Sequence, residues 1–209
     1  MKITKSYSLS EETLEKDIDK FIRIAKKGVY QYDYKYGQEG LKLIKAYFRM
    51  IEDEFKKQNF QVTKVCYKKL LFFLLQREYN YFNYEDIMSK FNSEKIVEKY
   101  FISLVKTCSV DELFKEFIEY LKVKEDYYFE SAEKTILSQL SSEDNGKFIQ
   151  MVAKESENIK EKDYALHDLI YLQLDLAKQA KDRKKYDQLC EKFIKIVGEE
   201  QKDEFDSKE

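Results

Sequence analysis

Residues 61–78 read QVTKVCYKKLLFFLLQRE, and the second half of this stretch is apolar on every side. A surface helix of a globular protein carries one apolar stripe, whereas a helix that is apolar all round is typical of a buried core element. We therefore predict that this stretch forms the most buried helix of the fold. Leu71, Phe73 and Leu74 should be almost inaccessible to water.

Apolar residues recur with the helical period on both sides of this stretch, from Leu14 to Val197. The chain has no proline and only five glycines, so helix breakers and residues for tight β-turns are scarce. Ser93 is predicted to cap a helix, Ser109 and Glu112 are predicted to start the next one, and Gly28 is predicted to end the first one. The sequence thus predicts an all-α fold of about ten helices joined by short loops.

A helical hairpin is predicted near the C-terminus, at about residues 163–197. Within it, 173-QLDLAKQAKDRKKYDQLCEKFIKI-196 places the small Ala177 on one helix, Tyr186 at the start of the next and Phe193 one turn before its end. This pattern resembles a tetratricopeptide-repeat hairpin of about 34 residues. The resemblance implies antiparallel hairpins that stack into an irregular α-solenoid, loosely similar to tetratricopeptide and HEAT proteins.

Length and composition predict one domain over residues 1–198, followed by an acidic tail. With six acids and two lysines, the tail at 199–209 is expected to be disordered. No apolar run approaches the roughly 20 residues that span a bilayer, and the N-terminus lacks the apolar segment of a secretory signal. Cys66, Cys108 and Cys190 are widely spaced and are predicted to be buried thiols in a reducing cytoplasm.

Tyrosines concentrate in two predicted junctions, 30-YQYDYKYG-37 and 79-YNYFNY-84. If the first three helices alternate in direction, both junctions lie at the same end of the domain and form a rim. A tyrosine can bury its ring while its hydroxyl stays in water, which suits it to interfaces. The rim either seals the end of an aromatic core or binds a partner. The candidate partner-binding residues are Tyr30, Tyr32, Tyr34, Tyr36, Tyr79, Tyr81 and Tyr84.

An alternative site is a basic segment, because residues 55–77 contain no acid. Its candidate anion-binding residues are Lys56, Lys57, Lys64, Lys68 and Lys69. Nucleic-acid sites combine such cations with aromatic stacking partners, and Phe60 and Tyr67 lie nearby. Several of these lysines would point to different sides of a helix, and the pI of about 5.8 is below the range of typical nucleic-acid-binding domains. The simpler interpretation is a buried helix whose lysine stems reach solvent.

Motifs for catalysis are scarce in this chain. Its single histidine, His167, is predicted to lie within a helix, one turn from Asp163, so that a histidine–carboxylate pair could form. No GxSxG or cysteine–histidine signature supplies a nucleophile, no HExxH or DxDxDG spacing supplies a metal site, and no glycine-rich loop could hold a phosphate. We therefore expect no enzyme activity, no metal and no cofactor.

Taken together, these patterns favour a cytoplasmic, non-catalytic scaffold or adaptor module that binds another protein or a peptide. Anion or nucleic-acid binding through residues 55–77 is the alternative, and nucleic acid is the less favoured partner. No membrane association is expected. The sequence leaves open whether the partner is a second copy of the chain, in a homodimer.

Overall fold

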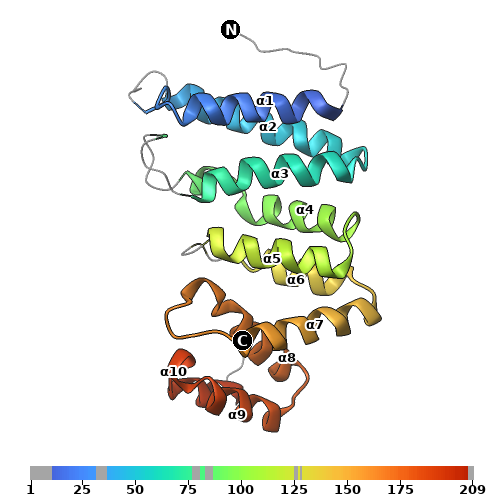
Figure 1. The fold of residues 1–209 in the computed structure, drawn as a ribbon, viewed down its shortest axis with the longest axis vertical. Helices are drawn as coiled ribbons and strands as arrows, with labels where there is room; N and C mark the ends of the chain where they lie inside the picture. The colour runs from blue at the N-terminus through green and yellow to red at the C-terminus, as the bar shows by residue number, and fades with distance from the viewer. Residues whose placement is uncertain are drawn as a thin grey trace. The chain divides into compact units, whose positions relative to one another are not determined.

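The computed structural model describes residues 11–31, 37–76, 81–82, 87–124, 127 and 129–206, and every regular element among them is a helix (Figure 1). The α-helices are α1 (Glu11–Ala25), α2 (Gly37–Lys56), α3 (Phe60–Leu75), α4 (Ser93–Val105), α5 (Val110–Lys124), α6 (Ser131–Gln139), α7 (Ser142–Ser156), α8 (Asp168–Gln179), α9 (Arg183–Lys192) and α10 (Ile194–Val197). The 3-10 helices are η1 (Met88–Lys90), η2 (Tyr164–Leu166) and η3 (Glu200–Asp206). Because these ranges contain ten α-helices and no strand, the predicted all-α class is confirmed.

The chain divides into two compact units, whereas the sequence led us to expect one domain over residues 1–198. The first unit comprises Met1–Thr107 and Phe129–Ile136, and the second comprises Cys108–Tyr128 and Leu137–Glu209. Helices α1 to α4 pack with one another in the first unit, and α5 and α7 to α10 belong to the second. Helix α6 begins in the first unit and ends in the second.

Helix α3 is the centre of the first unit and packs against α1, α2 and α4. All six residues from Leu70 to Leu75 are buried. The prediction for Leu71, Phe73 and Leu74 is confirmed, since their exposures are 0, 5 and 2%. A helix without a polar face has to be enclosed by its neighbours, and three helices enclose this one.

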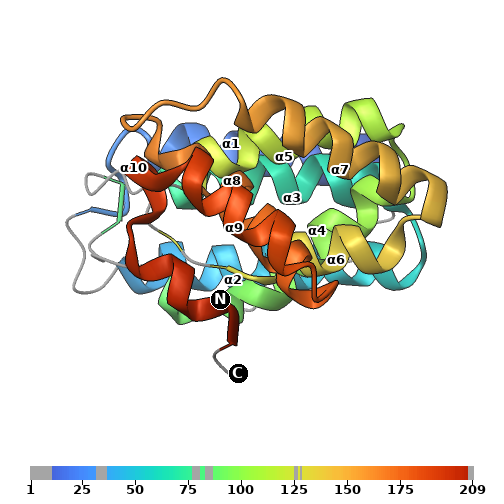
Figure 2. The same ribbon diagram turned by 90° about the horizontal axis from the view of Figure 1, so that it is seen from below.

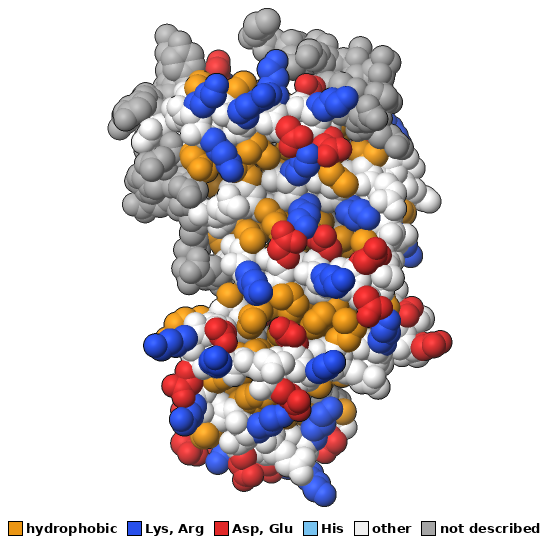
Figure 3. Space-filling model, viewed as in Figure 1, with side chains coloured by type: hydrophobic (Ala, Val, Ile, Leu, Met, Phe, Trp, Pro, Cys, Tyr) orange, Lys and Arg blue, Asp and Glu red, His pale blue; other side chains and the backbone are white. Residues whose placement is uncertain are grey.

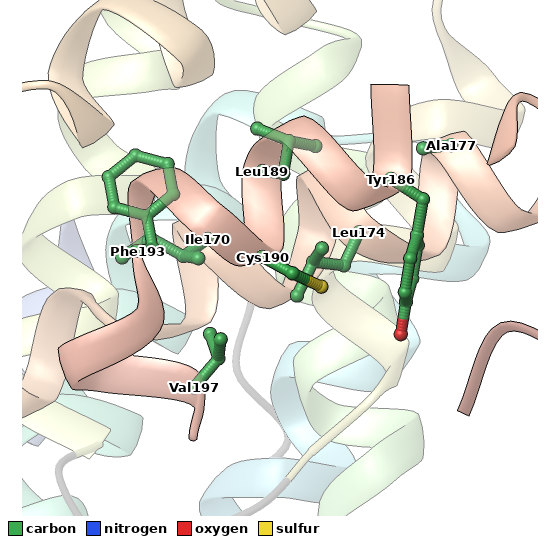
Figure 4. Packing of buried hydrophobic residues seen from close by; sticks show 8 residues of the cluster. All are labelled: Ile170, Leu174, Ala177, Tyr186, Leu189, Cys190, Phe193 and Val197. Carbon is green, nitrogen blue, oxygen red and sulfur yellow. The ribbon is translucent and has the colours of Figure 1, made fainter. Parts of the chain in front are cut away.

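In the second unit, α8 and α9 form a hairpin around a common apolar core. Figure 4 shows this core, which consists of Ile170, Leu174, Ala177, Tyr186, Leu189, Cys190, Phe193 and Val197. The turn passes through Lys181 in the left-handed region, with φ of 55°. The Asp182 side chain then caps α9 by accepting a hydrogen bond from the backbone nitrogen of Lys185 at 3.0 Å. Cap and core together hold the two helices in a hairpin.

The second helix of this hairpin is interrupted at Phe193. The sequence predicts one helix from Tyr186 to Val197, but α9 ends at Lys192 and α10 begins at Ile194. Phe193 has φ of −110° and ψ of 23°, outside the helical region. Its ring is 7% exposed and belongs to the core of the hairpin. The backbone break thus occurs at a residue whose side chain is anchored.

A buried ion pair joins α5 to α8 within the second unit. The ammonium of Lys124 lies 2.6 Å from a carboxylate oxygen of Asp168, and the side chain of Lys124 is only 3% exposed. The same ammonium donates a hydrogen bond to the carbonyl oxygen of Tyr127 at 3.3 Å. A charge this far from water requires such partners.

The prediction of a disordered tail is wrong for residues 200–206, because these residues form η3 beside α9 (Figure 2). The aromatic residue of the tail explains the order: the ring of Phe205 packs edge-on against Tyr186, with centroids 5.1 Å apart. The guanidinium of Arg183 lies 5.0 Å from the same ring. The Tyr186 hydroxyl also donates a hydrogen bond to the carbonyl oxygen of Gln201 at 2.9 Å. The ring of Phe205 and hydrogen bonds to Tyr186 and Arg183 therefore hold a segment whose composition suggests disorder.

Two helix ends lie where the sequence predicts them, and the cap of a third helix is shifted by one residue. Ser109 and Glu112, which the sequence predicts to start a helix, form a reciprocal cap before α5, since each side chain accepts a hydrogen bond from the other's backbone nitrogen. Gly28 adopts φ of 74° after α1, as a helix-ending glycine does. At α4 the cap is Asn92, whose side chain accepts from the backbone nitrogen of Lys95, so the prediction of Ser93 is wrong by one residue.

Bilayer crossing needs a helix that is both long and apolar, and among the described residues the structure contains none.

Candidate binding groove

A cavity of about 380 Å³ opens between α2 and α4 in the first unit, and we call it the α2–α4 groove. From α2 it is lined by Lys45, Phe48, Arg49 and Glu52, and from α4 by Lys95, Ile96 and Lys99. Tyr67 of α3, and Phe91 and Asn92 before α4, complete the lining. On each helix the lining residues recur at intervals of three and four positions, so they belong to one face of that helix.

Three aromatic side chains form the apolar part of the groove. Phe48 packs edge-on against Phe91 with ring centroids 5.3 Å apart, and it stacks on Tyr67 at 6.4 Å. Phe48 is 8% exposed and Tyr67 is 1% exposed. Phe91 and Ile96 are only half-buried, so the apolar surface continues to the rim. The groove thus presents a fixed aromatic base beside accessible apolar atoms.

Glu52 supplies the one carboxylate of the groove and is held by lysines on both sides. The ammonium of Lys99 lies 2.7 Å from a carboxylate oxygen of Glu52, and that of Lys56 lies 3.7 Å from it. The hydrogen bond from Lys99 lowers the pKa of Glu52. Burial, with a smaller contribution from the charge of Glu52, raises the pKa of the Tyr67 hydroxyl. Glu52 therefore stays ionised and Tyr67 stays a proton donor near neutral pH.

The remaining cations of the groove have no acidic partner among the described residues. Lys45, Arg49 and Lys95 are exposed and line the cavity. Within the part of the chain that the structure describes, none of the three forms an ion pair. Four cations and one carboxylate therefore give the groove an excess of positive charge.

The two tyrosine junctions meet, as the alternation of helices predicts. The rings of Tyr30 and Phe82 stack with centroids 6.1 Å apart, and Tyr81 stacks on Phe73 at 5.4 Å. Gly40 fits beneath this contact, because a Cβ atom at that position would lie 3.2 Å from both Phe82 and Tyr30. The described residues Tyr30, Tyr81 and Phe82 therefore pack on the aromatic core around α3.

Tyr30 is a core residue and not an exposed anchor, which corrects its place among the partner-binding candidates. Its side chain is 8% exposed and packs against Phe21, with ring centroids 5.5 Å apart. Tyr81 is half-buried. The other candidates, Tyr32, Tyr34, Tyr36, Tyr79 and Tyr84, lie outside the described residues.

The basic segment 55–77 is free of acids in sequence but not in space. Lys69 pairs with Glu15 at 2.6 Å and with Asp19 at 2.7 Å, and both acids belong to α1.

Three other lysines of this segment also have partners in the fold. Lys57 pairs with Glu54 at 2.7 Å, and Lys56 lies 3.7 Å from Glu52 and from Asp53. The ammonium of Lys68 lies 5.5 Å from the centre of the Phe72 ring. Lys64 is a half-buried residue of α3. On the face shown in Figure 3, basic and acidic side chains are likewise interspersed. Among the described residues of the segment, Lys56, Lys57 and Lys69 are therefore already paired with acids.

His167 lies immediately before α8, not within a helix as predicted. Its Nε2 atom lies 3.4 Å from the carbonyl oxygen of Lys160, and its ring packs edge-on against Tyr164 at 5.4 Å. The carboxylate of Asp163 accepts a hydrogen bond from the backbone nitrogen of Lys160 at 2.9 Å. The neighbouring Asp168 pairs with Lys124. Both acids near the histidine thus already serve the local fold.

Sequence reasoning missed the α2–α4 groove, although each wall leaves a trace in the sequence. Lys45, Phe48, Arg49 and Glu52 follow the spacing of one helix face, and so do Asn92, Lys95, Ile96 and Lys99. Taken alone, each set reads as an ordinary solvated face. Only the packing of α2 and α4 on α3 brings the two faces to one cavity. Comparison with models of protein families, with curated proteins and with solved structures gave no match for this chain.

Proposed function

We propose that this protein is a non-catalytic interaction module whose first unit binds a segment of another protein in the α2–α4 groove. The observation that carries the proposal is the aromatic base of a surface cavity of about 380 Å³. Binding sites combine concave apolar surface with a few polar groups that fix orientation. Phe48, Phe91 and Ile96 supply the apolar surface, and the Glu52–Lys99 pair supplies fixed polar groups.

An adaptor role agrees with the rest of the molecule. An irregular helical-repeat protein, which the hairpin at 163–197 resembles, offers exposed helix faces to its partners. The free thiols of Cys66 and Cys190 are buried and suit a reducing cytoplasm. The partner in this proposal is a peptide segment of a different chain, and sedimentation of the purified protein distinguishes it from a homodimer.

Selection from a display library of random heptapeptides tests the proposal. Peptides that bind the intact protein should lose at least about tenfold in affinity for the Ile96→Asn variant, because a rim contact of the groove becomes polar. The matched control is Ile118→Asn, which alters a half-buried isoleucine of α5 in the second unit. That variant should bind the same peptides as the unaltered protein does. Equal losses in both variants, or a library without binders, would contradict the proposal.

A further inference from the structure

We infer that the segment held by the α2–α4 groove is acidic and carries an apolar side chain beside its carboxylates. This inference rests on the proposed function and specifies its partner. The groove has cationic side chains on both walls and aromatic side chains between them. A matching ligand places anionic groups at the rim and an apolar group against Phe48, Phe91 and Ile96.

The placement of charge points to an anionic ligand. Lys45 and Arg49 are four residues apart on α2, and Lys95 and Lys99 are four apart on α4. Like charges at this spacing repel each other along a helix. Among these four cations, the described part of the chain pairs only Lys99, with Glu52. A carboxylate bound between the walls would relieve the repulsion that remains among the other three cations.

Tyr67 adds a hydrogen-bond donor to the cationic walls of the groove. Its side chain lines the cavity from α3 while being only 1% exposed. A carboxylate oxygen of the ligand would accept a hydrogen bond from its hydroxyl.

The aromatic contacts favour a peptide over a nucleic acid. Phe48 is engaged with both Phe91 and Tyr67, whereas nucleic-acid sites offer free ring faces on which bases stack. The chain already holds one acidic aromatic segment with the same chemistry, since Phe205 within 203-DEFD-206 packs against Arg183 and Tyr186.

The test uses the intact protein and the heptapeptides selected from the random library. Selected sequences should be enriched in Asp and Glu next to an aromatic or aliphatic residue. Fluorescence anisotropy then compares the most enriched peptide with a version in which every Asp and Glu is replaced by the corresponding amide. On the unaltered protein the amide version should bind at least about tenfold more weakly.

Two groove variants make the test specific to this site. Arg49→Glu combined with Lys95→Glu should weaken the acidic peptide at least about tenfold, and Tyr67→Phe should weaken it about threefold. Lys20→Glu combined with Lys122→Glu gives the same change of net charge on exposed residues of α1 and α5, and it should leave the affinity within about twofold of the unaltered protein.

Other results of these experiments would contradict either the inferred acidic ligand or the proposed function itself. One such result is that the selected peptides lose affinity for the Ile96→Asn variant and yet show no enrichment in Asp and Glu. That result would overturn the inference while the proposed function stands. A library without groove-dependent peptides would overturn both. A labelled single-stranded oligouridylate is measured in the same way. If it binds more tightly than the acidic peptide and loses this binding in the Arg49→Glu/Lys95→Glu variant, the groove is assigned to nucleic acid and the acidic peptide is overturned as its ligand.

Discussion

Lys124 and Asp168 form an ion pair whose two partners differ in burial, because their side chains are 3% and 33% exposed. Removing one partner of a buried pair is costly when the other is left as an isolated buried charge. Asp168→Asn leaves the enclosed ammonium without its counter-charge and should lower the free energy of unfolding by about 3 kcal/mol. Lys124→Met leaves a carboxylate that water can reach, so its cost should stay below about 1.5 kcal/mol. Urea unfolding of both variants measures the difference, and the reverse order would contradict this account of the pair.

At the scale of single residues, the sequence indicates burial better than it indicates pairing. Leu71 and Phe73 are predictable because the apolar pattern around them leaves no alternative to burial. The partners of Lys69 are not predictable, because Glu15 and Asp19 lie about fifty positions earlier and approach only when α1 packs on α3. The same limit hides the groove, since Arg49 and Lys95 are brought together by packing alone.

Among the helices, α3 lies at the centre of the core of the first unit. Phe73 packs with Phe21, Tyr81 and Phe82, so it joins α3 to α1 and to the second tyrosine junction. Phe73→Ala should lower the free energy of unfolding by about 3–5 kcal/mol, from lost burial and the cavity that remains. Chemical denaturation measures this value. A loss below about 1 kcal/mol would mean that α3 is not the central helix.

Helix η3 stabilises α9 from outside the core of the hairpin. Truncation after Gly198 removes the contacts of Phe205 with Tyr186 and Arg183. We expect the free energy of unfolding to fall by about 1–2 kcal/mol, since the lost ring contacts are only partly buried. Phe205→Ala should reproduce most of the loss, whereas removal of residues 207–209 should leave stability unchanged. Calorimetry of the three variants checks this order, and an unchanged melting temperature after truncation would contradict it.

The boundaries of elements depend on anchors that periodicity does not encode. The helix predicted over Tyr186–Val197 breaks at Phe193, because burial of that ring in the hairpin core competes with a continuous helical backbone. Helix α4 begins one residue from its predicted cap, since Asn92 and Ser93 both have capping side chains and only the backbone decides which of them reaches Lys95. The number and type of helices follow from the pattern, whereas their ends follow from tertiary contacts.

At the scale of the whole molecule, the path of the chain links the two units. It passes from the first unit to the second after Thr107, returns at Phe129, and leaves again after Ile136. Helix α6 therefore contributes residues to both units. Unfolding of either unit should disturb this helix, so the two units should lose their structure together.

Cys66 and Cys190 allow a direct test of this coupling, because each is a buried thiol in a different unit. Burial raises the pKa of Cys66 to about 12 and also raises the pKa of Cys190. Near pH 8 both thiols are therefore protonated and inert in the folded protein. Unfolding returns their pKa to about 8.5 and restores the reactive thiolate.

Pulse labelling with iodoacetamide at increasing urea concentrations, followed by mass spectrometry, gives one unfolding midpoint for each thiol. A Cys108→Ser background removes the half-buried third thiol, which would otherwise react early. We expect the midpoints of Cys66 and Cys190 to coincide, because both units need an intact α6. Labelling of one cysteine at clearly lower urea than the other would show instead that the units unfold independently, with α6 following whichever unit is more stable.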